Sequence, residues 1–75
     1  MTGSSAAKTI LGIIGKTQSE LADCLGTSKQ ALNNKFQRDT WTLKDLLKIS
    51  RIAKCKLLFR FDDGTEIVLT EPPEN

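Results

Sequence analysis

Apolar residues recur at the three- and four-residue spacing of amphipathic helices along the first two thirds of the chain. Polar residues that can cap a helix precede each of these stretches. The pattern predicts four helices, over residues 5–14, 18–25, 28–36 and 43–54. Because each has one apolar side, they are expected to pack around a common core.

The first predicted helix has two candidate caps, Ser4 and Ser5, and a broad apolar face that includes Ile13. Gly12 within it costs about 1 kcal/mol of helix propensity relative to alanine. We therefore expect Gly12 to mark a close approach to another helix. Gly15 is well placed just past the helix end.

The later helix starts carry capping boxes, in which a hydroxyl residue and a residue three positions on exchange hydrogen bonds with the backbone. Thr17 with Glu20 matches this pattern, and Thr42 with Asp45 is a close variant. Thr27 with Gln30 is a weaker match, and Ser28 competes with Thr27 for the same cap.

After Cys55 the apolar period changes to two, which predicts a β-hairpin over about residues 56–70. Asp62-Asp63-Gly64 is its turn, and Pro72-Pro73 ends the second strand. Residues 71–75 are expected to be loosely held.

The length of the hairpin loop follows from the two faces of the strands. A two-residue loop would set Arg60 opposite Ile67, whereas a three-residue loop with a left-handed Gly64 sets Arg60 opposite Glu66. We prefer the second register because it forms an ion pair and one apolar face. The residues expected to cover the helices are Leu57, Phe59, Ile67 and Leu69.

With 75 residues, of which 39% are hydrophobic, the chain is expected to form a single domain of marginal stability that gains from dimerisation. No apolar run approaches the roughly 20 residues of a membrane span, and no signal peptide is evident, so a cytoplasmic protein is expected. Cys24 and Cys55 are interpreted as small, mostly buried, reduced residues. Without histidine the chain offers no evident metal or cofactor site and no catalytic residues.

The net charge of +2 conceals an asymmetry. Residues 1–61 carry all 11 lysines and arginines and four acids, a balance of +7, whereas residues 62–75 carry five acids and no base, a balance of −5. The body of the chain can therefore approach a polyanion.

The segment GIIGKT is similar in composition to a phosphate-binding loop but lacks the spacing of its glycines. That loop needs a glycine five residues before Gly15, where this chain has Ile10. A chain of 75 residues also lacks room for the surrounding α/β domain, so this interpretation is rejected.

The third predicted helix carries a polar stripe without acids. From Gly26 to Arg38 there is no Asp or Glu, and the stripe is formed by Lys29, Gln30, Asn33, Asn34 and Gln37. Asn and Gln can pair bidentately with adenine, and Lys with guanine, in the major groove. A solvated helix face usually mixes acids with bases, so these residues are candidates for DNA base contacts.

The string QSELADCLGTSKQALNNKF, residues 18–36, resembles the helix-turn-helix of the phage repressor and Cro family, also called Xre-like. Gln18 opens the first helix, Ala22 lies where the helices cross, and Gly26 lies at the turn. The family usually has an inward residue one position before Phe36, where this chain has Lys35.

The resemblance implies a mainly α, four-helix domain of lambda-repressor or Cro-like type, followed here by the hairpin. It implies a small, cytoplasmic, bacterial or phage-encoded regulator, a repressor that binds double-stranded DNA sequence-specifically. We expect base contacts from Lys29, Gln30, Asn33 and Asn34. The residues expected at phosphates are Gln18, Ser28, Lys35, Gln37 and Arg38.

Binding to a two-fold operator requires a homodimer. Cro-like members use a C-terminal strand for this purpose, and we expect the hairpin to supply the interface through Leu58, Phe61 and Val68. The alternative is a protein-interaction module on the same fold, such as an antitoxin or a phage accessory factor, with weak or no DNA binding. No small-molecule ligand is evident in the sequence.

Overall fold

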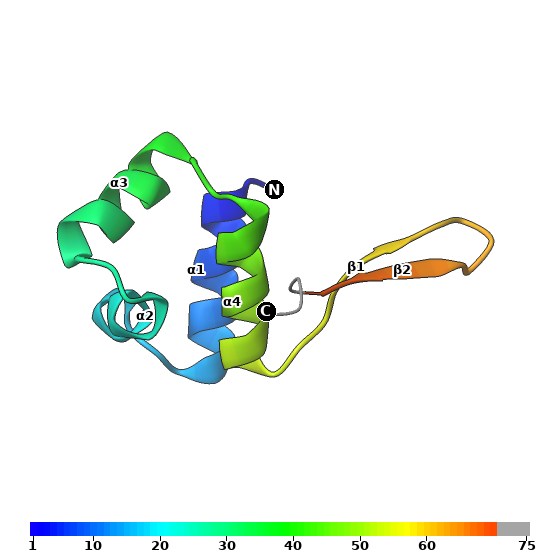
Figure 1. Cartoon of the computed structure of the whole chain (residues 1–75), viewed down its shortest axis with the longest axis horizontal. Helices are drawn as coiled ribbons and strands as arrows, with labels where there is room; N and C mark the ends of the chain where they lie inside the picture. Colours follow the sequence, from blue (N-terminus) through cyan, green and yellow to red (C-terminus); the bar gives the residue numbers. More distant parts are fainter. Residues whose placement is uncertain (71–75) are drawn as a thin grey trace, which may run out of the picture.

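The computed structural model describes residues 1–70 as four α-helices followed by two antiparallel strands (Figure 1). The elements are α1 (Gly3–Ile14), α2 (Gln18–Leu25), α3 (Lys29–Arg38), α4 (Leu43–Ala53), β1 (Leu57–Arg60) and β2 (Glu66–Leu69). The chain is thus mainly helical with a C-terminal hairpin, as the sequence predicts. The expectation for residues 71–75 lies outside the described residues.

Two of the predicted capping boxes form. Thr17 accepts from the backbone N–H of Glu20, and Thr42 accepts from that of Asp45, while each acid accepts from the backbone N–H of its cap residue. At the start of α3 the cap is Ser28, whose side chain accepts from the backbone N–H of Ala31. These bonds satisfy N–H groups that a helix start otherwise leaves unpaired.

The start of α1 differs from the prediction. Its cap is Thr2, which forms a capping box with Ser5, so the helix begins at Gly3. Neither Ser4 nor Ser5 is the cap residue, because Ser5 lies at the third helical position and the hydroxyl of Ser4 bonds to the end of α3. The prediction missed a cap that lies two residues nearer the N-terminus.

The expectations for Gly12 and Ile13 are also wrong. A Cβ atom at Gly12 would meet nothing within 4 Å, and Ile13 is 78% exposed. The helix buries Ala7 and Leu11 instead, which lie one turn apart on the same face. At 100° per residue, the two positions after Leu11 turn away from the core.

The core lies where the four helices meet, with α1 and α4 side by side and α2 and α3 packed against them (Figure 1). Leu21 and Leu32 are its largest fully buried side chains, each 1% exposed. The other buried members of this cluster are Ala7, Leu11, Ala22 and Ile49. This cluster positions α2 and α3 relative to each other.

The apolar spacing over residues 43–54 predicts that Leu43 faces inward, and both cysteines were expected to be mostly buried, but all three residues are on the surface. Leu43, in the first turn of α4, is 52% exposed. Cys24 and Cys55 are both exposed, free thiols. Cys24 lies on the outer side of α2, since the short helix buries only Leu21 and Ala22, and Cys55 lies in the segment that leaves α4.

The hairpin has the predicted register. Arg60 pairs with Glu66 and Phe59 with Ile67, and the loop is closed by Phe61, whose backbone N–H donates to the carbonyl of Thr65. Gly64 has a φ of 93°, a conformation that favours glycine. Arg60 Nη2 lies 2.6 Å from Glu66 Oε2, so the predicted ion pair is present.

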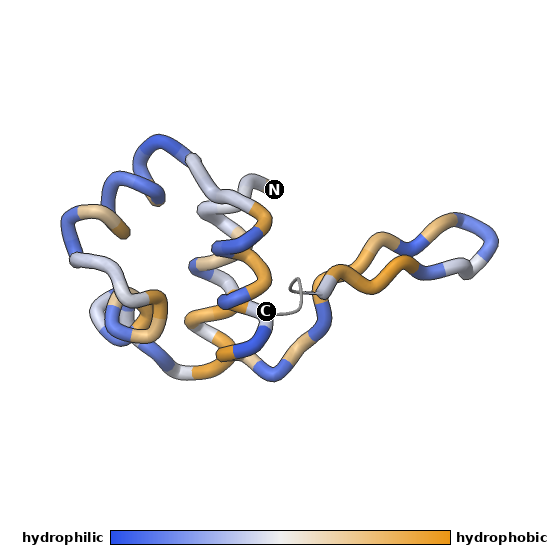
Figure 2. The backbone as a smooth tube through the Cα atoms, in the orientation of Figure 1, coloured by the Kyte–Doolittle hydropathy of each residue, from blue (hydrophilic) through white to orange (hydrophobic). Residues whose placement is uncertain are grey.

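The hairpin does not cover the helices in the expected way. It projects away from them as a mostly apolar arm (Figures 1 and 2). Of the four residues expected to cover the helices, Phe59 is 62% exposed and Ile67 50%, and the other two, Leu57 and Leu69, are half-buried. The left-handed Lys54, with a φ of 56°, ends α4 and turns the chain outward.

Candidate nucleic-acid interface

The turn between α2 and α3 consists of the three residues 26–28 and brings the start of α3 close to the end of α2. The N–H of Gly26 donates to the carbonyls of Ala22 and Asp23, and its φ of 67° turns the chain back at the end of α2. The N–H of Thr27 also donates to the carbonyl of Ala22. These bonds close α2, and the cap residue Ser28 then starts α3 at once.

The polar stripe of α3 faces solvent. Its members are all exposed, and none forms a side-chain hydrogen bond or ion pair within the described residues. They are Lys29, Gln30, Asn33, Asn34 and Gln37. Leu32 and Phe36 lie on the opposite side of the helix and pack into the core. The stripe therefore presents unengaged donors and acceptors on an anchored helix.

The residues expected at phosphates occupy different surroundings. Gln18 is the exposed first residue of α2, where backbone N–H groups point outward, and Arg38 is exposed in the last turn of α3. The Ser28 oxygen accepts the capping bond, which leaves its O–H as a donor. Gln37 belongs to the polar stripe.

Lys35 differs from the other basic residues of α3, because it bridges to α4. Its Nζ lies 2.8 Å from Oδ2 of Asp45, and both side chains are partly buried. Phe36 meanwhile packs on the core cluster. Lys35 is thus held by an ion pair to α4, while the next residue supplies the apolar contact with the core.

Asp45 joins this ion pair to the capping box of α4. Burial opposes ionisation of its carboxyl, but hydrogen bonds from Lys35 and from the backbone N–H of Thr42 outweigh burial and hold the pKa of Asp45 below its ordinary range. Because the folded-state pKa is depressed, the ionised carboxylate stabilises the fold above the unfolded-state pKa, and this stabilisation is lost as the pH falls.

We therefore expect the free energy of unfolding to decline as the pH is lowered through and below about 3.9, the ordinary pKa of an aspartate. Asp45→Asn should reduce this acid dependence, as measured by urea unfolding at a series of pH values. The pKa values of the exposed carboxyls of Glu20 and Asp63 are also lowered, by backbone N–H groups of Thr17 and Thr65, so these groups act in the same direction. An unchanged pH profile in Asp45→Asn would contradict this role.

A hydrogen-bond network at the C-terminal end of α3 could not be foreseen from the sequence. The carboxylate of Asp39 accepts from the backbone N–H of Ser4 at 2.8 Å, and the Ser4 hydroxyl lies 2.8 Å from the carbonyl of Phe36. Trp41 Nε1 donates to the same hydroxyl at 3.0 Å, and its ring meets that of Phe36 edge-on, with centroids 5.0 Å apart. The start of α1 thereby fixes the end of α3.

The hairpin, whose tip carries Asp62 and Asp63, lies away from this surface (Figure 1). Figure 1 shows α3 and the hairpin on opposite sides of the α1–α4 pair. Asp39 and Asp45, the two acids that follow α3 in the chain, are both engaged in the contacts described above, whereas Asp23 in α2 is exposed. The surface of α3 thus combines exposed Lys29 and Arg38 with amide side chains. Basic side chains suit contacts with phosphates, and amide side chains suit hydrogen bonds with the edges of bases.

Comparisons with protein-family models, with curated proteins and with solved structures find no match to this chain. Within residues 1–70, no helix has the length and apolar character needed to cross a membrane. The same residues contain no group of three or more His, Cys, Asp or Glu side chains that could hold a metal ion. Function is therefore inferred from the geometry and chemistry of the residues themselves.

Proposed function

We propose that this chain is a helix-turn-helix protein, similar to the phage repressor and Cro family, that binds double-stranded DNA sequence-specifically and represses transcription. The observation that carries the proposal is the acid-free stripe of unengaged amide and lysine side chains on α3. In this proposal α3 lies in the major groove, and α2 crosses the DNA backbone.

In the bound complex, Lys29, Gln30, Asn33 and Asn34 contact base edges. Gln18, Ser28, Gln37 and Arg38 contact phosphates and set the register of the protein on the duplex. Lys35 is also assigned to a phosphate, which it would approach from its ion pair with Asp45. A homodimer formed through the hairpin places two α3 helices on two half-sites.

A gel-shift titration of duplex DNA at several salt concentrations tests this function. Contacts between basic side chains and phosphates release counterions, so the affinity should fall steeply as salt rises. Selection of bound sequences from random DNA should then yield two half-sites related by two-fold symmetry. Absence of retardation at low salt would refute DNA binding.

Arg38→Ala should weaken binding evenly across DNA sequences. Loss of one phosphate contact is expected to reduce the slope of log affinity against log salt by about one unit. The exposed Arg38 side chain forms no bond within the described residues, so the fold should be unaffected. An unchanged slope would remove Arg38 from the set of phosphate contacts.

A second candidate function is a protein-interaction module, as in an antitoxin or a phage accessory factor. The observation that favours it is the apolar surface of the projecting hairpin, where Phe59, Phe61, Ile67 and Val68 are each 46–62% exposed. The same gel shift separates the two functions, because this module would retard duplex DNA weakly or not at all.

A further inference from the structure

The two faces of the hairpin differ in apolar character. Side chains alternate between the faces of a strand, so the pairing register assigns each residue to one side. One side, which we term face A, comprises Leu57, Phe59, Phe61, Ile67 and Leu69. The other, face B, carries Leu58 and Val68 together with the Arg60–Glu66 ion pair. Face A is therefore the more apolar side.

Face A exposes more large apolar side chains than face B. Phe59 is 62% exposed, Phe61 51% and Ile67 50%, whereas on face B only Val68, at 46%, is a comparably exposed apolar residue. Three large apolar side chains on one side of a two-stranded sheet form a patch that a soluble monomer rarely leaves open. Such a patch is typical of a surface that a partner covers.

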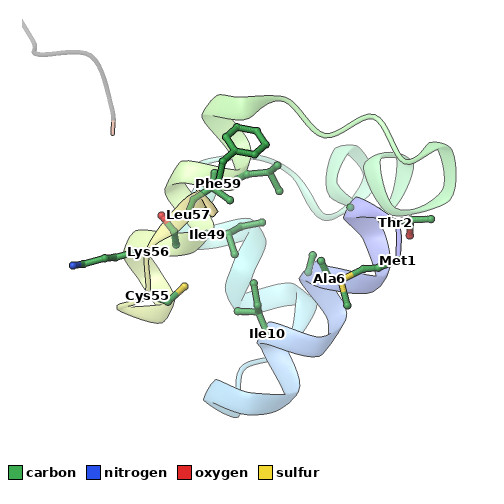
Figure 3. A pocket seen from close by; sticks show the side chains of 13 residues that line it. Met1, Thr2, Ala6, Ile10, Ile49, Cys55, Lys56, Leu57 and Phe59 are labelled. Atoms are coloured by element: carbon green, nitrogen blue, oxygen red, sulfur yellow. The ribbon is translucent and has the colours of Figure 1, made fainter. Parts of the chain in front are cut away.

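An apolar groove with a volume of about 640 Å³ begins where face A meets the helices (Figure 3). The apolar residues that line it include Ala6, Ile10, Leu46, Ile49, Leu57 and Phe59. Leu57 and Phe59 belong to both features, so the groove and face A form one continuous apolar surface.

We propose that two copies of this chain exchange their hairpins, with face A near the tip of each hairpin seated in the groove of the other copy. Phe61 and Ile67 would enter the groove between α1 and α4, and the same contact would recur about a two-fold axis. The inference specifies the dimer assumed in the proposed function but does not depend on DNA binding.

Charge favours a second copy as the occupant. The tip of the hairpin carries Asp62 and Asp63, both exposed, whereas residues 1–61 have a balance of +7. Lys56 belongs to the wall of the groove, and Lys54 is exposed close by. Exchange therefore brings an acidic tip to a basic body and an apolar face to an apolar groove.

The accessible surface of the chain is larger than that expected of a compact monomer of the same mass. The chain has an accessible surface of 5588 Å², whereas a compact monomer of 8.3 kDa exposes about 4,600 Å². Its radius of gyration is 13.1 Å, against about 11.3 Å for a compact chain of 75 residues. The projecting hairpin (Figure 1) contributes to this excess of exposed surface.

Ile67→Lys and Val68→Lys form a matched pair for the test, because the two residues are adjacent in β2, similarly exposed and on opposite faces. In sedimentation equilibrium, the wild type and Val68→Lys should have twice the mass of the chain, and Ile67→Lys the mass of one chain. A monomeric wild type at tens of micromolar would overturn the exchange. Equal dissociation of the Val68→Lys and Ile67→Lys variants would also overturn the exchange, because it would favour an interface that includes face B.

A chemical cross-link tests whether the hairpin tip of one copy lies in the groove of the other, and it leaves the side chains of face A unchanged. Cys55 lines the groove and is exposed, so in a Cys24→Ser background Asp62→Cys should couple to Cys55 of the other copy through a short bis-maleimide. The expected product is a covalent dimer, in excess over that formed by Cys24→Ser alone and by Gln37→Cys, whose helix lies across the molecule (Figure 1). A yield of covalent dimer no higher than in these two controls would overturn the proposed contact between tip and groove.

The failure of this inference is distinguishable from that of the proposed function. If Ile67→Lys stays dimeric while duplex DNA is still retarded in a salt-dependent way, only the hairpin exchange is wrong. If the cross-linked dimer forms but duplex DNA is never retarded, the exchange stands and DNA binding is wrong.

Discussion

Leu32→Ala is expected to lower the free energy of unfolding by about 2–5 kcal/mol. Leu32 is 1% exposed and lies in the cluster that joins α3 to α1, α2 and α4. Its truncation removes buried apolar surface and leaves a cavity that the surrounding helices fill only in part. Domains have about 0.05–0.15 kcal/mol of stability per residue, so this loss is a large share of the total for 75 residues.

Urea unfolding of Leu32→Ala beside Asn33→Ala is the measurement. Asn33 is the next residue in α3, is exposed and forms no bond within the described residues, so its truncation should change stability by less than about 0.5 kcal/mol. The midpoint of Leu32→Ala should fall while the slope of the transition is kept. Superimposable curves for the two variants would contradict the placement of Leu32 in the core.

The features that the sequence predicted correctly depend on neighbours in the chain. The capping boxes at Thr17 and Thr42 involve residues three positions apart, and the hairpin register follows from the alternation of side chains around Gly64. The stripe on α3 was likewise identifiable from helical spacing, and its residues are exposed in the structure. Its role at DNA bases remains a prediction.

The errors concern contacts between distant segments. The start of α1 depends on Thr2, and the hydroxyl of Ser4, a candidate cap, bonds to the end of α3 more than 30 residues away. The direction of the hairpin depends on the left-handed Lys54, whose conformation has no clear signal in a lysine. Cys24 and Cys55 were interpreted as mostly buried from their residue type alone, whereas the structure exposes Cys24 on α2 and Cys55 in the segment after α4.

The exposed residues of α3 are those that the sequence predicts, whereas the contacts that hold the helix in place were not predicted. Lys35 ties the middle of the helix to Asp45, and the network of Ser4, Asp39 and Trp41 ties its C-terminal end to α1. Both sets of contacts lie off the polar stripe, so the stripe is free while the helix is fixed. A pre-positioned helix loses less conformational freedom when it binds, which favours the proposed docking into a groove.

The sharpest test of the proposed function is truncation of Gln30 or Asn33 to alanine. Each side chain is exposed, lies in the first two turns of α3 and can pair bidentately with an adenine edge. We expect each substitution to cost about 1–3 kcal/mol on the selected operator and much less on random DNA. Competition gel shifts with operator and random duplex at one salt concentration measure this difference.

Arg38→Ala serves as the contrast, because a lost phosphate contact should weaken operator and random DNA to similar extents. Thermal unfolding of all three variants should match the wild type, since none of these side chains bonds within the described residues. If Gln30→Ala and Asn33→Ala weaken operator and random duplex equally, α3 does not distinguish bases through them. The specificity would then have to come from other residues or from the shape of the DNA.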